Sequence, residues 1–416
     1  MLGPSPLVHP PPVAAGPSQL PAVKGSRLSQ LDALRGLAAL SVFLGHAFGM
    51  MSPSSKLLLT IQNTPLHFFY DGNAAVLLFF VLSGFVLNLR YADGRSHPSG
   101  WVGSFIIRRV FRIYPAFLAS MGLAVLFRTC LFRPEWTNGF SDWFSSLWRA
   151  PLLWGEVARC STLVAPGIQT RFINPPVWSL VYEMRISFFF PIIILLVNPK
   201  RRPRWDLVLI IAVYVLSLVL TPFASSFQYI PQFTLGAVCA KYFGRIQPKL
   251  AAFSSSAKVL WLIIALFLYG ASAMTEPLRL HDWRLTFLIA QMVGLGSAVI
   301  ILVSASSGRI SSLLRARVCQ FVGCTSYSFY LTHFLFLFVV APPCYLATGS
   351  YLIAWLVTLA VAYLVSYLLF RFVEVPGMQL GSWASDIFAR RWDAGRKGAK
   401  VSSSASASRD IASPQK

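Results

Sequence analysis

Long apolar runs constrain the fold of this chain more than any other feature of its sequence. At least nine runs approach or exceed the roughly 17–25 residues needed to cross a bilayer. The chain of 416 residues is 56% hydrophobic and only 12% charged, whereas soluble domains carry about 25% charged residues. The runs are continuously apolar and do not alternate, which excludes a membrane β-barrel. The sequence therefore predicts an all-α, polytopic membrane helix bundle.

We expect about ten transmembrane helices. The fifth and sixth predicted spans are short and lie next to Pro222 and Pro231, so counts from nine to eleven are compatible with the sequence. The predicted spans cover residues 33–51, 73–90, 113–131, 178–197, 206–221, 229–244, 259–275, 285–304, 321–340 and 351–370.

The net charge of +22 would suit a nucleic-acid-binding protein, but the distribution of the charge argues against that class. If the N-terminus is inside, most of the 36 Lys and Arg residues fall on one side of the membrane. Clusters at 108–112, 200–204 and 241–258 all belong to that side. This positive-inside bias predicts that both termini are cytoplasmic, and it explains most of the individual loop cations.

The composition divides the chain into three parts. Residues 1–28 are rich in Pro, Ala, Gly and Ser, have no signal-peptide pattern, and are predicted to be a disordered tail. Residues 29–377 form the predicted membrane domain. Residues 378–416 are predicted to be a basic, largely disordered cytoplasmic tail, because residues 395–416 consist largely of Ser, Ala and Lys.

Arg35 and His46 both lie within the first apolar run and are separated by ten uncharged residues. Eleven helical positions return to within roughly 20° of the starting direction over a rise of about 16 Å. Both side chains therefore face the same side of one helix. Charged and titratable side chains are costly inside a membrane, so this pair marks a functional site.

Two further titratable residues fall within predicted spans. Glu183 lies about one turn inside the fourth span, where Ser179 is able to cap the helix. It either interacts with the helix dipole and Arg185, or lies close enough in depth to orient and charge His46. His333 ends an unusually polar stretch in the ninth span and either joins helices or contributes to the site.

Arg109 and Arg112 are three residues apart in a predicted cytoplasmic segment, so they share one face of a helix. Two guanidinium groups so placed suit bidentate recognition of phosphate. The same spacing is also compatible with a role in membrane orientation alone.

The one long outer loop, 132–177, contains four tryptophans, which act either as interfacial anchors or as platforms for a sugar ring: Trp136, Trp143, Trp148 and Trp154. The six cysteines lack the spacing of metal ligands, and no metal is expected. Cys130 and Cys160 would both face the outer compartment, and the sequence leaves open whether they form a disulfide.

Six segments, in order over about residues 29–377, resemble the acyltransferase-3 family of integral membrane O-acyltransferases. They are RLSQLDALRGLAALSVFLGH, LLFFVLSGFVL, RRVFRIYP, PPVWSLVYEMRISFFFP, TSYSFYLTH and FRFVEVPG. Each segment alone is unspecific, whereas their combination is highly specific. Some relatives append an extracytoplasmic hydrolase-like domain, which is not expected here, so the chemistry would fall to the membrane domain.

The resemblance implies roles for particular residues. Arg35 and His46 match the family's Arg-x10-His pair, and Arg109 and Arg112 match its paired cytoplasmic arginines. The remaining matches are the Trp-Ser-Leu-x-x-Glu element at Trp178, Ser179 and Glu183, the Tyr-Ser-x-Tyr-Leu-x-His element at Tyr327, Ser328, Tyr330 and His333, and the Glu-x-Pro element at Glu374 and Pro376. Many relatives have a second Glu where this chain has Met184, so Glu183 is the only acid expected there.

Together, the residues and the resemblance predict an O-acyltransferase of a bacterial inner membrane. Acyl-CoA, and acetyl-CoA first of all, is expected as a co-substrate whose phosphates lie near Arg35, Arg109 and Arg112. His46 would be the general base or, alternatively, an acyl relay, and no permanently bound cofactor is expected.

The acceptor is expected to be a hydroxyl of a cell-surface or exported carbohydrate, with glycan-assembly machinery as a partner. A lipid-linked or secondary-metabolite hydroxyl is the alternative acceptor. A proton-coupled transporter is an alternative of a different class, although the inverted repeats common in transporters are not found. A scaffold protein would have no need of Arg35 and His46 on one helix face.

Overall fold

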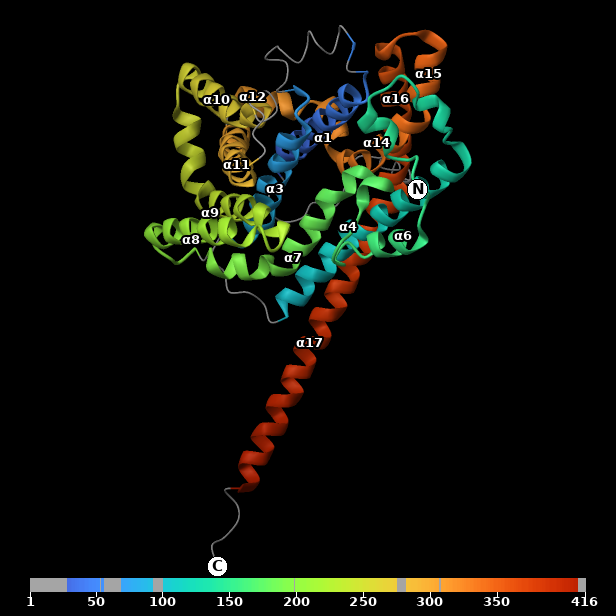
Figure 1. The fold of residues 1–416 in the computed structure, drawn as a ribbon. Helices are drawn as coiled ribbons and strands as arrows, with labels where there is room; N and C mark the ends of the chain where they lie inside the picture. Colours follow the sequence, from blue (N-terminus) through green and yellow to red (C-terminus); the bar gives the residue numbers. More distant parts are fainter. Residues whose placement is uncertain are drawn as a thin grey trace, which may run out of the picture.

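The structure is a computed structural model that describes residues 28–52, 54–55, 69–92, 100–197, 199–274, 282–306 and 308–410. These residues form helices and turns with no β-strand, which confirms the all-α prediction. The helices pack into one bundle from which the last helix projects (Figure 1). The predicted tail 1–28 lies, except for its last residue, outside the described residues.

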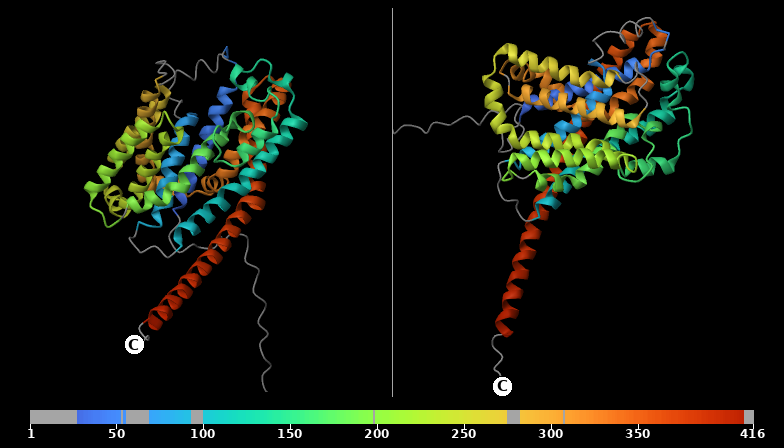
Figure 2. Two further views of the ribbon diagram at one scale, coloured as in Figure 1. Left: turned by 60° about the horizontal axis from the view of Figure 1, so that its bottom comes forward. Right: turned by 60° about the vertical axis from the view of Figure 1, so that its left-hand side comes forward.

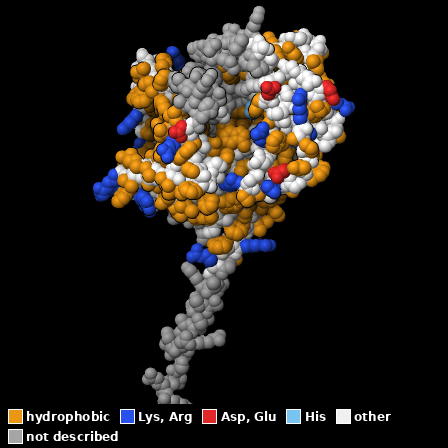
Figure 3. All heavy atoms as spheres, viewed as in Figure 1, with side chains coloured by type: hydrophobic (Ala, Val, Ile, Leu, Met, Phe, Trp, Pro, Cys, Tyr) orange, Lys and Arg blue, Asp and Glu red, His pale blue; other side chains and the backbone are white. Residues whose placement is uncertain are grey.

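Eight helices among the described residues are long and apolar enough to cross a membrane. They are α1 (Ser29–Gly49), α3 (Gly72–Leu89), α4 (Trp101–Leu126) with a π-helical turn (Phe127–Leu131), α7 (Trp178–Leu196), α8 (Pro203–Leu220), α10 (Ser255–Tyr269) with the first residues of η7 (Gly270–Met274), α11 (Trp283–Ser306) and α16 (Tyr351–Leu369). A ninth span results if α13 (Arg317–Cys324) and α14 (Ser326–Val339), bent by 72°, count as one. The chain is a multi-pass membrane protein, and hydrophobic side chains cover much of the visible face of its bundle (Figure 3).

The sixth predicted span, 229–244, coincides with α9 (Ile230–Ala252). This helix has 23 residues, but it is not among those apolar enough to span a membrane. Its second half carries Lys241, Arg245 and Lys249, which lower its mean hydropathy. The count of eight among the described residues lies below the predicted range of nine to eleven, and it reaches the lower end of that range only if the bent α13–α14 pair is one span.

Glycines allow α3 and α9 to pack in close contact at the centre of the bundle. A β-carbon on Gly236 would collide with the carbonyl oxygen of Val81, and one on Gly84 would collide with that of Phe233. Small residues at such positions let the backbones of two membrane helices approach closely. The two further views show that α8 and α10 lie at the periphery of the bundle (Figure 2).

We expect Gly236→Ala to destabilise the bundle. Its new methyl group has only backbone atoms of α3 to displace, and overpacking of this kind costs about 1–3 kcal/mol. Thermal unfolding of the detergent-purified protein measures the effect. Gly244→Ala is a matched control on the same helix, because no atom lies within 4 Å of a β-carbon there. Equal unfolding temperatures for the two variants would contradict the prediction.

The C-terminal helix α17 (Val375–Asp410) departs from the sequence prediction. A largely disordered tail was expected from residue 378, but the chain stays helical as far as Asp410. Its first part packs along α4, and a β-carbon on Gly103 would collide with the ring of Phe388. Trp392 lies against Gly100 in the same way. Composition alone does not reveal this tertiary partner, which supports the helix before it leaves the bundle (Figure 1).

Residues 132–177 form a compact loop region of short helices. These are η3 (Pro134–Thr137), α5 (Asp142–Ser146), α6 (Trp154–Ser161), η4 (Thr170–Phe172) and η5 (Pro175–Val177). Ser141, which caps α5, binds the end of α1. We call the end of the bundle covered by this region the loop end, and the end from which α17 projects the α17 end.

Candidate active site

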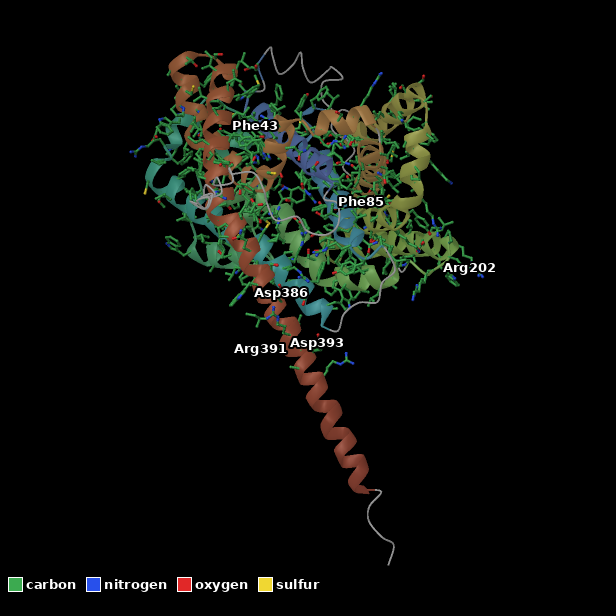
Figure 4. The ribbon with its side chains drawn as sticks, turned by 180° about the vertical axis from the view of Figure 1, so that it is seen from behind. Phe43, Phe85, Arg202, Asp386, Arg391 and Asp393 are labelled. Atoms are coloured by element: carbon green, nitrogen blue, oxygen red, sulfur yellow. The ribbon has the colours of Figure 1, made fainter. Side chains whose placement is uncertain are left out.

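A cavity of about 780 Å³ lies among α1, α3, α4, α7, the α13–α14 pair and the start of α17. Its volume is in the range of small-molecule and cofactor sites, roughly 300–1,000 Å³. Asp386 belongs to its lining and lies where α17 leaves the bundle (Figure 4), so the cavity extends to the α17 end. Arg35, Arg109 and Arg112 all line it, so the structure brings together the three predicted phosphate-binding residues.

Each of the three arginines is paired with a carboxylate. Arg35 Nη1 lies 2.9 Å from Asp32 Oδ1, one turn earlier in α1. Arg109 forms a short ion pair with Glu183 and also donates from Nε to Ser187 Oγ at 3.0 Å. Three ion pairs therefore line the cavity, and an incoming phosphate would compete with a carboxylate for each guanidinium.

Arg112 pairs with Glu374, whose side chain is completely buried, while 35% of the Arg112 side chain is exposed. The second carboxylate oxygen of Glu374 accepts a hydrogen bond from Ser328 Oγ at 2.7 Å. Glu374 ends the π-helical turn between α16 and α17, Arg112 belongs to α4 and Ser328 to α14. The pair thus links three helices, which is a structural role in addition to the predicted one.

Tyr327 and Tyr330 line the cavity from α14. Tyr327 Oη donates to the carbonyl of Ile113 at 2.7 Å, and the Arg112 guanidinium lies 5.3 Å from the centre of its ring. Tyr330 Oη lies 2.7 Å from Ser179 Oγ and donates to the carbonyl of Pro176 at 3.0 Å. These contacts hold the polar stretch of α14 against α4 and α7.

Ser179 differs from expectation, whereas Trp178 takes a supporting position. The N-cap of α7 is Val177, so Ser179 lies in the first turn and does not cap the helix. Trp178 does not line the cavity but packs against Tyr182 and Tyr229, with ring centres 5.8 and 6.0 Å away. Ser179 therefore belongs to the site, whereas Trp178 packs outside the cavity, where it supports α7.

His46 and His333 form a hydrogen-bonded pair nearer the loop end. His46 Nδ1 lies 3.0 Å from His333 Nε2, and His333 Nδ1 lies 3.1 Å from the carbonyl oxygen of Phe329. Since a carbonyl only accepts hydrogen bonds, we assign the proton on neutral His333 to Nδ1, which leaves Nε2 as an acceptor. His46 must then donate from Nδ1, and its own Nε2 keeps a lone pair that can accept a proton.

Glu183 pairs with neither of the two side chains considered for it, Arg185 and His46. Glu183 pairs with Arg109 and accepts a hydrogen bond from Ser83 at 3.4 Å on the cavity side. The residue that orients His46 is His333, which comes from a helix 287 positions away in the chain. Arg35 and His46 do lie on one helix: Arg35 lines the cavity, and His46 belongs to the histidine pair.

Tyr330 contacts both the cavity and the histidine pair. It lines the cavity, and its ring centre is 5.9 Å from that of His333. Neither histidine is among the residues that line the cavity. Tyr330 therefore belongs to the cavity wall and also contacts the histidine pair.

The sequence did not indicate Phe334 as a site residue, and it did not distinguish Trp143 from the other tryptophans of the loop. Trp143 lies nearly parallel to His46 with ring centres 6.0 Å apart, and Phe334 stands perpendicular to His46 at 4.6 Å. Trp143 was one of four tryptophans in the loop, with no local signal to separate it from the others. Phe334 directly follows His333, but only the rotation of α14 shows that it faces His46.

Cys130 and Cys160, whose pairing was left open, are both free thiols. Burial, with a smaller contribution from nearby Glu156, raises the pKa of the Cys160 thiol to about 11. The thiol is therefore protonated at neutral pH, a form that exchanges with disulfides slowly.

The model of the acyltransferase-3 family, described as an acyltransferase domain, matches residues 28–371. The chain belongs to the acyltransferase-3 family. It is similar to "Acyltransferase MdmB" of Streptomyces mycarofaciens, with 28% identity over 74% of this chain and 79% of the relative. It is also similar to "Protein 2 in picA locus" of Rhizobium radiobacter, with 30% identity over 39% of this chain and 79% of the relative. No solved structure matches this chain.

Family membership makes this membrane protein an acyltransferase, and the transporter alternative is not retained. All thirteen residues that the sequence and the resemblance placed at the site are described, and all lie in the matched region except Glu374 and Pro376, which follow its end by three and five residues.

Proposed function

We propose that this acyltransferase moves an acyl group, acetyl first of all, from cytoplasmic acyl-CoA to a hydroxyl group of a cell-surface or exported carbohydrate in a bacterial inner membrane. The observation that carries the proposal is the chain of hydrogen bonds from His46 through His333 to the carbonyl of Phe329. It leaves His46 Nε2 free to take a proton, as general-base catalysis at a hydroxyl requires.

In this mechanism, His46 Nε2 accepts the proton of the acceptor hydroxyl while the oxygen of that hydroxyl attacks the thioester carbonyl. A carbon–oxygen bond forms and the carbon–sulfur bond breaks. The CoA thiolate leaves and takes the proton back from His46, so the products are an ester and free CoA. His333 acts as a positioning residue, because its Nε2 accepts from His46 Nδ1 and stabilises the imidazolium that forms.

The cavity supports the assignment of the donor side. Its volume of about 780 Å³ suits an extended pantetheine arm, and Arg35 lies in its wall. The Arg35–Asp32 pair lies within one helix and both side chains are partly exposed, at 24% and 14%. Of the three ion pairs, this one needs the least rearrangement of helices to exchange Asp32 for a phosphate.

The charge pattern supports the assignment of the two sides. In the proposed orientation, the α17 end faces the cytoplasm and the loop end faces outward. Cations then gather on the cytoplasmic side, including Arg109 and Arg112 on α4 and the basic residues of α17.

Release of free thiol from acyl-CoA tests this function directly. Purified protein in detergent should release CoA thiol from acetyl-CoA when a hydroxyl acceptor is present, and the rate should fall with propionyl- and butyryl-CoA. The His46→Ala variant supplies the background rate. If the parent protein and this variant release thiol at the same rate with every thioester, the proposed reaction is wrong.

A further inference from the structure

Trp143 occupies an unusual position for a loop tryptophan. It belongs to α5, its indole is nearly parallel to the His46 ring with centres 6.0 Å apart, and it stands edge-on to Phe334 at 5.8 Å. At the same time, 43% of Trp143 is exposed. One side chain is therefore in contact with the proposed base and with the surroundings of the loop end.

The chain holds this indole in place by contacts to the end of α1. Ser141 donates from its backbone nitrogen to the carbonyl of Met50 at 3.0 Å and from Oγ to that of Gly49 at 2.6 Å. Gly49 also leaves room for the ring, because a β-carbon there would lie 3.2 Å from Trp143 Cζ3. Trp143 thus has a fixed place one turn beyond His46.

The other loop tryptophans show that this arrangement is not a general property of the region. Trp148 is only 3% exposed, donates from Nε1 to the carbonyl of Ile173 at 3.1 Å and stacks on Phe338. Its role is therefore packing. Trp154 is 67% exposed at the first position of α6. Among these three, Trp143 alone combines contact with His46 and substantial exposure.

We propose that Trp143 binds the acceptor, and that the acceptor presents its hydroxyl on a saturated ring such as a pyranose. This inference rests on the proposed function, since it places the acceptor at His46. A flat indole offers an apolar face to the C–H bonds of a sugar ring and a polar N–H at its edge. A ring stacked there would have its hydroxyl groups next to His46, whose Nε2 is the free acceptor.

The test compares ring and chain acceptors in the full-length protein. Methyl α-D-glucopyranoside is the ring probe, 1-propanol is the probe without a ring, and water is the acceptor in acyl-CoA hydrolysis. We measure the acceptor KM and kcat for the parent, Trp143→Ala, Trp143→Phe and Trp143→Leu. Trp154→Ala is the matched control, because it removes an exposed indole from the same loop region.

We expect Trp143→Ala to raise the KM for the glucoside by about tenfold, the size of effect that follows loss of one aromatic contact. The KM for 1-propanol should rise less than the KM for the glucoside, because 1-propanol has no ring to stack, and acetyl-CoA hydrolysis should fall less than transfer to the glucoside. Trp143→Phe should restore most of the affinity because it keeps a flat ring, whereas Trp143→Leu should not. Trp154→Ala should behave as the parent does.

Three kinds of result would overturn the inference. The first is an unchanged KM for the glucoside in Trp143→Ala, or a glucoside that the parent does not use although it uses 1-propanol. The second is an equal rise in KM for both probes. The third is a fall in hydrolysis that matches the fall in transfer, because the indole would then only support His46. A parent protein that releases no thiol with any acceptor overturns the proposed acyl transfer first, before any variant is compared.

Discussion

Replacing His46 by alanine is expected to lower kcat for acyl transfer by at least about 10², because a general base typically contributes 10²–10⁴-fold. The protein should remain folded and able to bind acyl-CoA, since His46 lies outside the lining of the cavity. Initial rates of thiol release at saturating acetyl-CoA measure kcat, and equilibrium binding of CoA measures the donor site separately.

The two histidines allow matched controls. His46→Gln should not recover activity, because an amide forms hydrogen bonds but does not take up a proton at neutral pH. His333→Gln should keep more activity than His333→Ala, since its amide oxygen can still accept from His46 Nδ1. The pH dependence of kcat/KM should lose one limb in His46 variants that retain measurable activity. A His46→Ala enzyme with full activity and an unchanged pH profile would rule out His46 as the base.

Arg112→Met is expected to cause the largest loss of stability. It would leave the buried carboxylate of Glu374 with Ser328 as its remaining partner among the contacts described above. Removing one member of a buried ion pair typically costs about 3–5 kcal/mol. We expect a lower yield of folded protein and a lower temperature of thermal unfolding in detergent.

A double variant separates this structural role from donor binding. Arg112→Met combined with Glu374→Gln removes both charges, so most of the stability should return. If Arg112 also contacts the donor, the KM for acetyl-CoA should stay raised in the double variant. An Arg112→Met protein as stable as the parent would show that the pair does not hold α4, α14 and the start of α17 together.

The class of this fold follows from sequence alone. Backbone groups in hydrocarbon must be satisfied within the segment, so continuous apolar runs become helices whatever their neighbours are. Helical geometry also places Arg35 and His46 correctly on one face, because both lie within one element and the angle per residue is constant. The predicted grouping of Arg35, Arg109 and Arg112 holds too, although its basis includes family resemblance.

The partners of the charged groups were not predictable in this way. Glu183 and His46 were expected to share a depth in the membrane. The depth of a residue does not determine how its helix is rotated about its axis, and so it does not determine which side chains meet. The rotation of α7 turns Glu183 toward Arg109, and that of α14 turns His333 toward His46. The extent of α17 likewise depended on contact with a distant segment, α4.

Local order along one helix is thus encoded by the residues of that helix, through hydropathy and the helical repeat. The pairing of His46 with His333, of Glu374 with Arg112 and the position of Trp143 beside His46 arise only when separate helices and loops pack. The two pairs depend on polar contacts between segments far apart in the chain, and the position of Trp143 depends on the room that Gly49 leaves for its ring. Such contacts have no local signature, and so the tertiary structure alone determines which side chains form the site.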